Sequence, residues 1–293
     1  MGLSKSELKD LAHSVYESEV EKPPKRILAQ AFGISRSGLY YKPIRPTLDL
    51  EVKNEILKWH EEDDTLGSKK LAVLMSRSRG SVSRVMIKYG IYPRRKRPAH
   101  KYPGKADNIV NNKLLTQDYE NYEVLFTDIF QFRLYDGSWL YCCFVIRKKT
   151  RQILSFCYSW GMRAELVSES ITRVDLVTDL TETEVIMHSD QGKQYGAKIT
   201  IDACLELHFE RSMSRAGTPT DNPIAERFVQ TFKLAVIERY SFQTIGEFEE
   251  CAEKWLNFYN NTRPHESLEQ VSPNDFAKQN DLQSVPYLSP NFV

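Results

Sequence analysis

The spacing of apolar residues along the chain changes character near residue 120. Before that point, apolar positions recur at helical spacing in the stretches 49–60, 67–78 and 81–90, which predicts a series of amphipathic helices. After it, the segment NYEVLFTDIFQFRLYDGSWLYCCFVIRKKTRQILSFCYSW alternates through three β-rich runs. Asp136-Gly137 and the basic RKKTR segment are typical of the hairpin turns between them. The pattern therefore indicates a helical front part and a second part that starts with a β-meander.

The rest of the second part alternates between the two periodicities. The predicted elements are a helix at 164–178, a strand at EVIMHSD, a helix at 197–207, a strand at HFERS, a long helix from about 223 to 240 and a final helix at 246–260. Three antiparallel strands followed by alternating helices and strands favour a mixed α/β sheet of the ribonuclease-H type. The fold-class prediction is such a sheet, preceded by all-α, helix-turn-helix-like units.

Residues 26–42, RILAQAFGISRSGLYYK, resemble a helix-turn-helix. Ala29, Gly33 and Leu39 stand where two crossing helices need a small residue, a turn glycine and an apolar contact. A structural helical hairpin is the alternative. In the helix-turn-helix interpretation, the residues that face outward toward DNA are Arg36, Ser37 and Tyr40.

A second helical pair is predicted after a Pro-containing linker, KPIRPTLD. It consists of a helix at SKKLAVLMSRS, a turn at Gly80 and a helix at SVSRVMIKYG, in which Arg84 and Lys88 are expected to be exposed toward DNA. The EEDD run at 61–64 could be imagined as a metal cluster. Four adjacent side chains on a helix point in different directions, however, so we expect a solvated helix end.

The segment 94–105, RRKRPAHKYPGK, is basic and is interrupted by prolines and a glycine. Prolines exclude a continuous helix there, and the cations Arg94, Arg95 and Arg97 are suited to follow a phosphate backbone. A plain solvated linker is the alternative.

The formal net charge of +1 conceals an asymmetry between the two parts. Residues 1–113 carry 23 Lys and Arg against 13 Asp and Glu, which gives +10, whereas residues 114–293 carry 17 against 26, which gives −9. A basic front part joined to an acidic second part suggests a module that binds anions and a domain that uses carboxylates.

Three acidic residues stand where packing alone would not place them. Asp128 interrupts the apolar alternation of VLFTDIFQF, Asp190 directly follows the strand VIMHS, and Glu226 lies early in a helix that Asn222 can cap and Pro223 can begin. Singly, each is more simply a surface or capping group. Together they offer hard oxygen ligands for two Mg²⁺ (or Mn²⁺) ions about 4 Å apart, the arrangement that phosphodiester chemistry uses.

The spacing and the surrounding motifs carry a family resemblance. With 61 residues between Asp128 and Asp190 and 35 between Asp190 and Glu226, the chain resembles the DD(35)E core shared by retroviral integrases and insertion-sequence transposases. FTDIF with DGSWLY, HSDQGKQY, SMSRAGTPTDNPIAERFVQTFK and YNNTRPHESL resemble, in order, motifs of the insertion-sequence-three family, second reading frame type. The match extends over about 120–276.

The resemblance implies roles for individual residues. Asp128, Asp190 and Glu226 would be both catalytic residues and metal ligands, and Lys233 would contact DNA phosphate beside them. The loop Ser212–Gly217, with Ser214 and Arg215, would lie against the DNA end. Tyr259, Asn260, Arg263 and His265 match the terminal signature, for which we expect packing of the last helix on the core.

The resemblance also implies the partners. These are double-stranded DNA (the inverted-repeat ends of a mobile element, and target DNA), a homodimer or higher oligomer on that DNA, and the protein of an upstream reading frame. The predicted reaction is metal-dependent strand cleavage and 3′-OH strand transfer by a polynucleotidyl transferase. A DNA-binding regulator with an inactive ribonuclease-H-like domain is the alternative, and a ribonuclease-H-type hydrolase is a third.

The expected domains are two DNA-binding helical units at 1–45 and 46–93, a basic linker at 94–118, an integrase-type catalytic core with a C-terminal helix at 119–280 and a tail at 281–293. No apolar run approaches the roughly 20 residues that span a bilayer, and no signal-peptide core is present. We therefore expect no membrane partner and a cytoplasmic, nucleoid-associated protein. The five cysteines form no CxxC pair, and we expect buried, reduced thiols.

Overall fold

The computed structural model describes residues 5–18, 23–36, 44–94, 106–116, 118–181 and 183–293. The chain divides into two compact units, Met1–Val52 and Lys53–Val293. Helix α3 (Ile44–Glu62) contains the division between them. The α helices are α1 (Lys5–Ser18), α2 (Lys25–Ala31), α3, α4 (Ser68–Leu74), α5 (Arg79–Lys88), α6 (Lys113–Thr116), α7 (Ala164–Thr172), α8 (Lys198–Glu206), α9 (Pro223–Phe232), α10 (Ile245–Asn261) and α11 (Pro273–Gln279).

The first unit contains a small apolar cluster between α1 and α2. Ala12 of α1 packs with Leu28 and Ala29 of α2. Gly33 adopts a φ of 60° directly after α2, a conformation that favours glycine, which agrees with its predicted place in the turn. The second helix of the helix-turn-helix interpretation, with Ser37 and Tyr40, lies outside the described residues.

Two predictions for the next helices were wrong. The segment expected to be a linker is helical from Ile44 onward, because proline is tolerated in the first turn of a helix. Gly80 is not the turn between α4 and α5 but a residue of the first turn of α5, which begins after Ser78 accepts a hydrogen bond from the Ser81 amide. The change of direction occurs instead at Ser76, whose φ is 49°.

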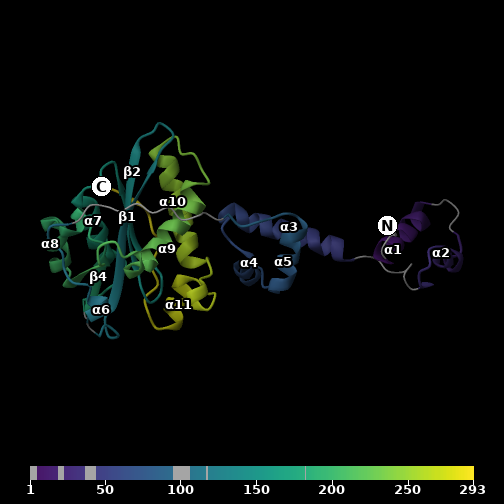
Figure 1. The fold of residues 1–293 in the computed structure, drawn as a ribbon, viewed down its shortest axis with the longest axis horizontal. Coiled ribbons are helices and arrows are strands. Elements are labelled where there is room, and N and C mark those ends of the chain that lie inside the picture. The colour runs from purple at the N-terminus through teal and green to yellow at the C-terminus, as the bar shows by residue number, and fades with distance from the viewer. Residues whose placement is uncertain (1–4, 19–22, 37–43, 95–105, 117, 182) are drawn as a thin grey trace. The chain divides into compact units, whose positions relative to one another are not determined.

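The second part of the chain contains a six-stranded mixed sheet (Figure 1). Strands β1, β2 and β3 pair antiparallel, and β4 and β5 extend the sheet from β1 in parallel. The order β5-β4-β1-β2-β3, with β6 at the far edge, is that of a ribonuclease-H-like sheet and confirms the predicted fold class. The strands are β1 (Glu123–Arg133), β2 (Trp139–Arg147), β3 (Ile153–Ser159), β4 (Val185–Ser189), β5 (Phe209–Met213) and β6 (Asn291–Phe292).

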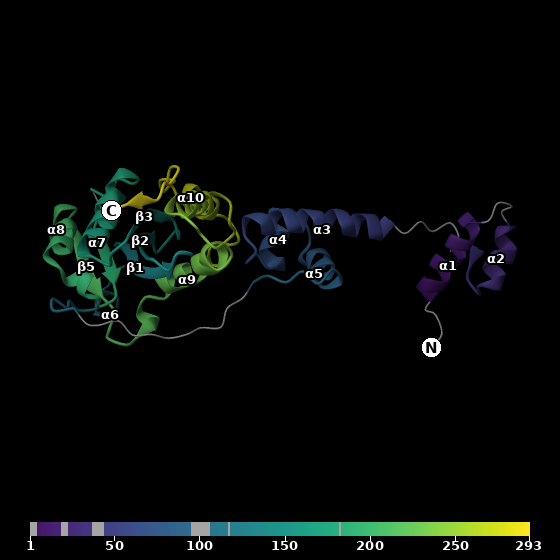
Figure 2. The same ribbon diagram turned by 90° about the horizontal axis from the view of Figure 1, so that it is seen from above.

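Each face of the sheet has its own apolar core. Phe228 and Phe232 of α9 and Trp255 of α10 pack on one face, and Leu166 of α7 and Cys204 of α8 pack on the other. Figure 2, seen from above, shows the two helical layers with the sheet between them. Successive residues of a strand point to opposite faces of the sheet. The even-numbered residues of β1 therefore face α9 and α10, and odd-numbered residues such as Leu125 face α7 and α8.

Short helical segments complete the architecture. Helix α9 continues directly into a π-helix, η5 (Lys233–Ile237), so the predicted long helix exists but changes its hydrogen-bonding pattern at Lys233. The predicted helix at 164–178 is α7 followed by a 3₁₀ turn.

Four of the five cysteines are buried, as predicted, and Cys251 is half-buried. Within the described ranges, no helix is both long and apolar enough to cross a membrane. The 3₁₀ segments are η2 (Arg173–Leu176), η3 (Lys193–Gly196), η4 (Pro219–Asp221) and η6 (Glu266–Leu268).

Candidate active site

Asp128 lies in the middle of β1 on the face that meets α9. Val124, Phe126 and Phe130 have the same parity as Asp128 and belong to the core beneath α9 and α10, so the carboxylate points to that side of the sheet. Its Oδ1 accepts a hydrogen bond from the Ile129 amide at 2.8 Å. A carboxylate in a central strand therefore faces the helix that carries Glu226.

Asp190 follows the last residue of β4, the strand parallel to β1. Phe126 is level with His188 in this pair, and extending both strands by two residues brings Asp128 level with Asp190. The Asp190 Oδ1 accepts a hydrogen bond from the Gly192 amide at 2.8 Å. A Cβ at position 192 would lie 3.0 Å from that oxygen, so glycine permits the close backbone approach that holds the carboxylate.

Glu226 is in the first turn of α9, and Asn222 fixes where this helix begins. Pro223 occupies the predicted first helical position, but Asn222 makes no side-chain cap. Its Nδ2 instead donates to the carbonyl of Thr127 at 3.2 Å, one residue before Asp128. Sequence reasoning missed this contact because it interpreted Asn222 only as a local cap. The bond ties the start of α9, and with it Glu226, to the Asp128 segment of β1.

The three carboxylates influence one another electrostatically. Burial raises the pKa of Asp128 to about 7, and the negative charges of Asp190 and Glu226 add to the effect, against the Ile129 amide and the Lys233 ammonium. Burial also raises the pKa of Asp190, which the Gly192 amide opposes. These interactions agree with the strand register and the Asn222 contact, which bring Asp190 and the start of α9 to the Asp128 segment of β1.

Lys233 lies on the same side of the sheet as this acidic site. Its Nζ is 5.4 Å from the centroid of the Phe130 ring, and Phe130 is two residues beyond Asp128. Lys233 also begins the π-helix η5, a distortion that is frequent at functional sites. Its contact with a DNA phosphate stays a prediction.

Asp128, Asp190 and Glu226 lie near one another, but their oxygens are not arranged as a complete metal-binding site. In the part of the chain that the structure describes, no three His, Cys, Asp or Glu side chains converge tightly enough to hold a metal ion. The donor set is nevertheless the hard oxygen set that Mg²⁺ or Mn²⁺ prefers. The raised pKa of Asp128 indicates negative charge that a cation would compensate.

The loop that follows β5 is held by internal contacts. Ser214 is buried, and its hydroxyl lies 3.0 Å from Nε2 of His188, whose Nδ1 lies 2.8 Å from the Ser212 hydroxyl. Arg215 is exposed and bonds both oxygens of Asp221. His188 thus connects the ends of β4 and β5. Binding of DNA by Ser214 and Arg215 stays a prediction.

The remaining candidates for DNA contact lie in the helical front. Arg36 is exposed after α2, and Arg84 and Lys88 are exposed on α5. Arg94 is half-exposed, and its guanidinium bonds Asp64 and the carbonyl of Glu238. Arg95 and Arg97 lie outside the described residues.

The terminal signature does more than pack the last helix. Tyr259 packs edge-on against His265, with ring centroids 4.7 Å apart. Asn260 binds the backbone of Ile153 through both side-chain atoms, and Arg263 forms an ion pair with Asp63 at 2.6 Å. The expected packing role therefore holds for Tyr259, while Asn260 and Arg263 make polar contacts with distant segments.

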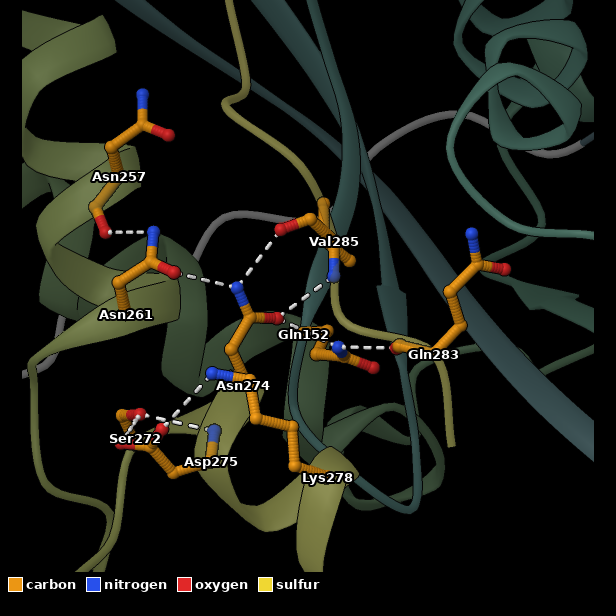
Figure 3. Close-up of polar contacts among 9 residues, drawn as sticks. All are labelled: Gln152, Asn257, Asn261, Ser272, Asn274, Asp275, Lys278, Gln283 and Val285. Carbon is orange, nitrogen blue, oxygen red and sulfur yellow. Dashed lines mark hydrogen bonds and ion pairs between the residues drawn. The ribbon is translucent and has the colours of Figure 1, made fainter. Parts of the chain in front are cut away.

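A polar network after the signature connects α10, α11 and the tail (Figure 3). Asn274 donates to the carbonyl of Val285 and to Oδ1 of Asn261, and its Oδ1 accepts from the Val285 amide and from Gln152. Ser272 caps α11 through the Asp275 amide. Gln152, directly before β3, also donates to the carbonyl of Gln283, so these bonds hold residues 283 and 285 beside the start of β3.

The chain is similar to known proteins across most of its length. Two models described as "Integrase core domain" match residues 118–219 and 207–273. The transposase for insertion sequence element IS904 of Lactococcus lactis is 25% identical over 254 residues, covering 83% of this chain and 100% of that protein. Transposase InsF for insertion sequence IS3fB of Escherichia coli is 30% identical over 153 residues, 50% of each chain. A chain of the simian T-cell lymphotropic virus intasome in complex with PP2A regulatory subunit B56 gamma superposes with a TM-score of 0.46 at 13% identity, covering 80% of this chain and 77% of that one.

Proposed function

This chain belongs to the DDE transposases of the insertion-sequence-three family, and from that premise we propose that it cleaves and joins DNA strands at the ends of a mobile element. Asp128, Asp190 and Glu226 are the proposed catalytic residues. The proposed products are a free 3′-hydroxyl at the element end and, after strand transfer, a covalent joint to target DNA.

One observation carries this proposal. The carboxylate of Asp128 is held in a central strand, level with Asp190 and beside the start of the helix that carries Glu226. Burial, together with the charges of Asp190 and Glu226, raises its pKa to about 7. Such a group costs stability unless a cation compensates it. Three separate elements, β1, the end of β4 and α9, contribute to one acidic site.

The three carboxylates would hold two divalent ions, Mg²⁺ or Mn²⁺. Bound there, the ions supply activation of the attacking oxygen and stabilisation of the leaving oxygen. The protein itself fixes the carboxylates: the Ile129 and Gly192 amides orient Asp128 and Asp190. Asn222 holds the start of α9 on β1. Lys233 would position a phosphate of the bound strand beside them.

DNA is the proposed partner of several basic side chains. Arg84 and Lys88 on α5 are exposed, and we place the inverted-repeat end there. Arg215, Arg36 and the basic linker would add contacts with phosphates. Two such ends imply a dimer or higher oligomer, with the upstream-frame protein as a further partner. Because its proposed substrate is DNA, the proposed location is the cytoplasm, with the nucleoid.

A DNA-binding regulator with an inert catalytic domain is the second candidate. The observation in its favour is that no three metal-ligating side chains among the described residues converge. It predicts DNA binding that is unchanged by Mg²⁺ and yields no joined product.

Strand transfer on a labelled element end tests the proposal. The purified chain is incubated with end-labelled duplex DNA that carries the inverted repeat, with supercoiled target and with Mg²⁺, Ca²⁺ or EDTA. We expect joined products with Mg²⁺ only. Specific end binding without cleavage at any Mg²⁺ concentration would favour the regulator.

A further inference from the structure

The acidic run Glu61–Asp64 at the end of α3 is not the solvated helix end that its sequence suggests. Glu62 lies 3.5 Å from Lys254, Asp63 lies 2.6 Å from Arg263, and Asp64 lies 2.9 Å from Arg94. The Asp63 side chain is completely buried. The sequence interpretation failed because the cations that bind Asp63 and Glu62 are about two hundred residues away.

The Arg263–Asp63 pair is the centre of this contact. Both side chains are buried, at 6% and 0% exposure. The Arg263 Nη2 donates to the Thr65 hydroxyl at 3.1 Å, and the second Asp63 oxygen accepts from the amide and the hydroxyl of Thr65. Although burial raises the pKa of Asp63, the charge and hydrogen bonds of Arg263 hold it below its ordinary value. Removal of either partner would leave a buried charge without compensation.

Further contacts surround this pair. Lys69 lies 2.6 Å from Glu266. Arg94 donates to the carbonyl of Glu238 at 2.7 Å, and Glu238 is the C-cap residue directly after η5. Exposed pairs of this kind each contribute little stability. They help instead to fix where the helices lie. The Arg94 contact reaches Glu238, which follows the continuous helical segment of α9 and η5 that contains Glu226.

Of the three ion pairs that the described residues form between the helices and the catalytic domain, two reverse the charge balance of the two parts, while Lys69–Glu266 follows it. The basic front part contributes the acids Glu62 and Asp63, and the acidic second part contributes the bases Lys254 and Arg263. Residues 53–94 also belong to the same compact unit as the sheet. Local complementarity of this kind specifies one arrangement of two surfaces.

We propose that residues 62–64 dock the helices of residues 53–94 on the catalytic domain, and that Arg263 of the terminal signature is the residue they bind there. The contact between them fixes the helices in one position. Arg263 is then a positioning residue. The docking holds α5, and the DNA on it, at a constant distance from Asp128, Asp190 and Glu226. This consequence for cleavage rests on the proposed function, whereas the docking itself does not.

A distance measurement tests the docking without any use of catalysis. Spin labels are placed at Ile87→Cys on α5 and Leu205→Cys on α8, whose side chains are 67% and 64% exposed, in a Cys251→Ser background. We expect one narrow distance distribution. Asp63→Asn keeps the shape of the side chain but removes the charge that binds Arg263, and it should at least double the width of the distribution.

Two further variants make the result decisive. Arg77→Ala removes an exposed ion pair with Glu55 whose two partners both belong to residues 53–94, and it should leave the distribution unchanged. A bismaleimide bridge between Lys69→Cys and Glu266→Cys should restore the narrow distribution to Asp63→Asn. In the bridged protein the spin labels are attached as ketoximes to p-acetylphenylalanine at positions 87 and 205, so that the bismaleimide meets only the two new thiols. A parental distribution in Asp63→Asn, with circular dichroism showing it folded, overturns the docking. If Asp63→Asn fails to fold, Arg263→Lys, which cannot reach both Asp63 and Thr65, takes its place under the same criterion.

The cut position on labelled element-end DNA tests the consequence for cleavage. The parent should cut at one phosphodiester, and Asp63→Asn should spread its cuts over several nucleotides until the bridge is added. A broadened distance with an unchanged cut position would refute the positional consequence and leave the docking intact. Absence of cleavage by the parent would refute the proposed function and this consequence with it, and the distances alone would then decide the docking.

Discussion

The side chain of Asn260 forms two hydrogen bonds with the backbone of Ile153, donating to its carbonyl and accepting from its amide, each at 2.9 Å. Ile153 begins β3, and β6 pairs only with Cys157 and Tyr158 further along that strand. A side chain on α10 thus satisfies the backbone groups of the strand where the sheet provides no partner.

Asn260→Ala is predicted to lower the free energy of unfolding by about 2–4 kcal/mol, because a buried amide and a buried carbonyl lose their partners together. Urea denaturation followed by circular dichroism measures the change. Asn280→Ala, which removes an exposed bond to the Phe276 carbonyl, is the control and should change stability by less than about 0.5 kcal/mol. Equal effects in the two variants would contradict the role assigned to Asn260.

Asp128→Asn, Asp190→Asn and Glu226→Gln are each predicted to abolish strand cleavage and leave binding of the element end largely intact. Each change removes a charged oxygen ligand without creating a cavity. Gel analysis of labelled ends measures cleavage, and a mobility shift measures binding. Glu206→Gln, on the exposed surface of α8, should cleave normally. Cleavage near the parental rate by any of the three would remove that residue from the site.

The raised pKa of Asp128 predicts a stability that depends on pH in the absence of metal. Between pH 4 and pH 7 the folded protein keeps the Asp128 proton and the unfolded chain does not, so the free energy of unfolding should fall as pH rises, by at most about 4 kcal/mol. Asp128→Asn removes this loss. In EDTA its stability advantage over the parent should be about 2–3 kcal/mol larger at pH 8 than at pH 5.

Urea titrations at the two pH values check this prediction, with the exposed Asp175→Asn as control. Mg²⁺ should raise the Tm of the parent at pH 8, because bound cations stabilise the folded state, and should have little effect on Asp128→Asn. A parent whose stability is the same at pH 5 and pH 8 in EDTA would contradict the electrostatic account of the site.

Lys233→Ala is predicted to reduce strand transfer by about tenfold or more, equivalent to about 1.4 kcal/mol, with little change in Mg²⁺ affinity. Lys233→Arg keeps the positive charge and should retain part of the activity. Single-turnover strand transfer and calorimetric titration of Mg²⁺ separate the two effects. Lys198→Ala, on the exposed face of α8, is the control. A loss of Mg²⁺ binding in Lys233→Ala would place this lysine at the metals instead of the DNA.

Replacement of Arg84 and Lys88 by alanine is predicted to weaken DNA binding on all sequences. Each lost phosphate contact should reduce the slope of log affinity against log salt concentration by about 1. Fluorescence anisotropy over a range of salt concentrations measures both quantities, and Lys198→Ala again serves as the matched control. A slope that is the same as in the parent would show that α5 does not contact DNA phosphates.

The sequence by itself determined the parts of this protein that local periodicity encodes. Alternation identified the three antiparallel strands, and helical spacing identified α3, α7, α8, α9 and α10, because a buried face imposes its own repeat on the chain. Asp128 was conspicuous for a similar reason, since a carboxylate interrupts an apolar strand at a cost. The order of the motifs then connected it with Asp190 and Glu226.

Only the tertiary structure decided which distant groups meet. Asn222 was interpreted as a local cap and instead binds the Thr127 carbonyl, and the acidic run that seemed solvated places Asp63 in a buried pair with Arg263. Hydrogen bonds and ion pairs leave no repeat in a sequence, because any suitable donor can satisfy an acceptor once folding brings them together. The folded arrangement of the sheet and its helices selects the partner.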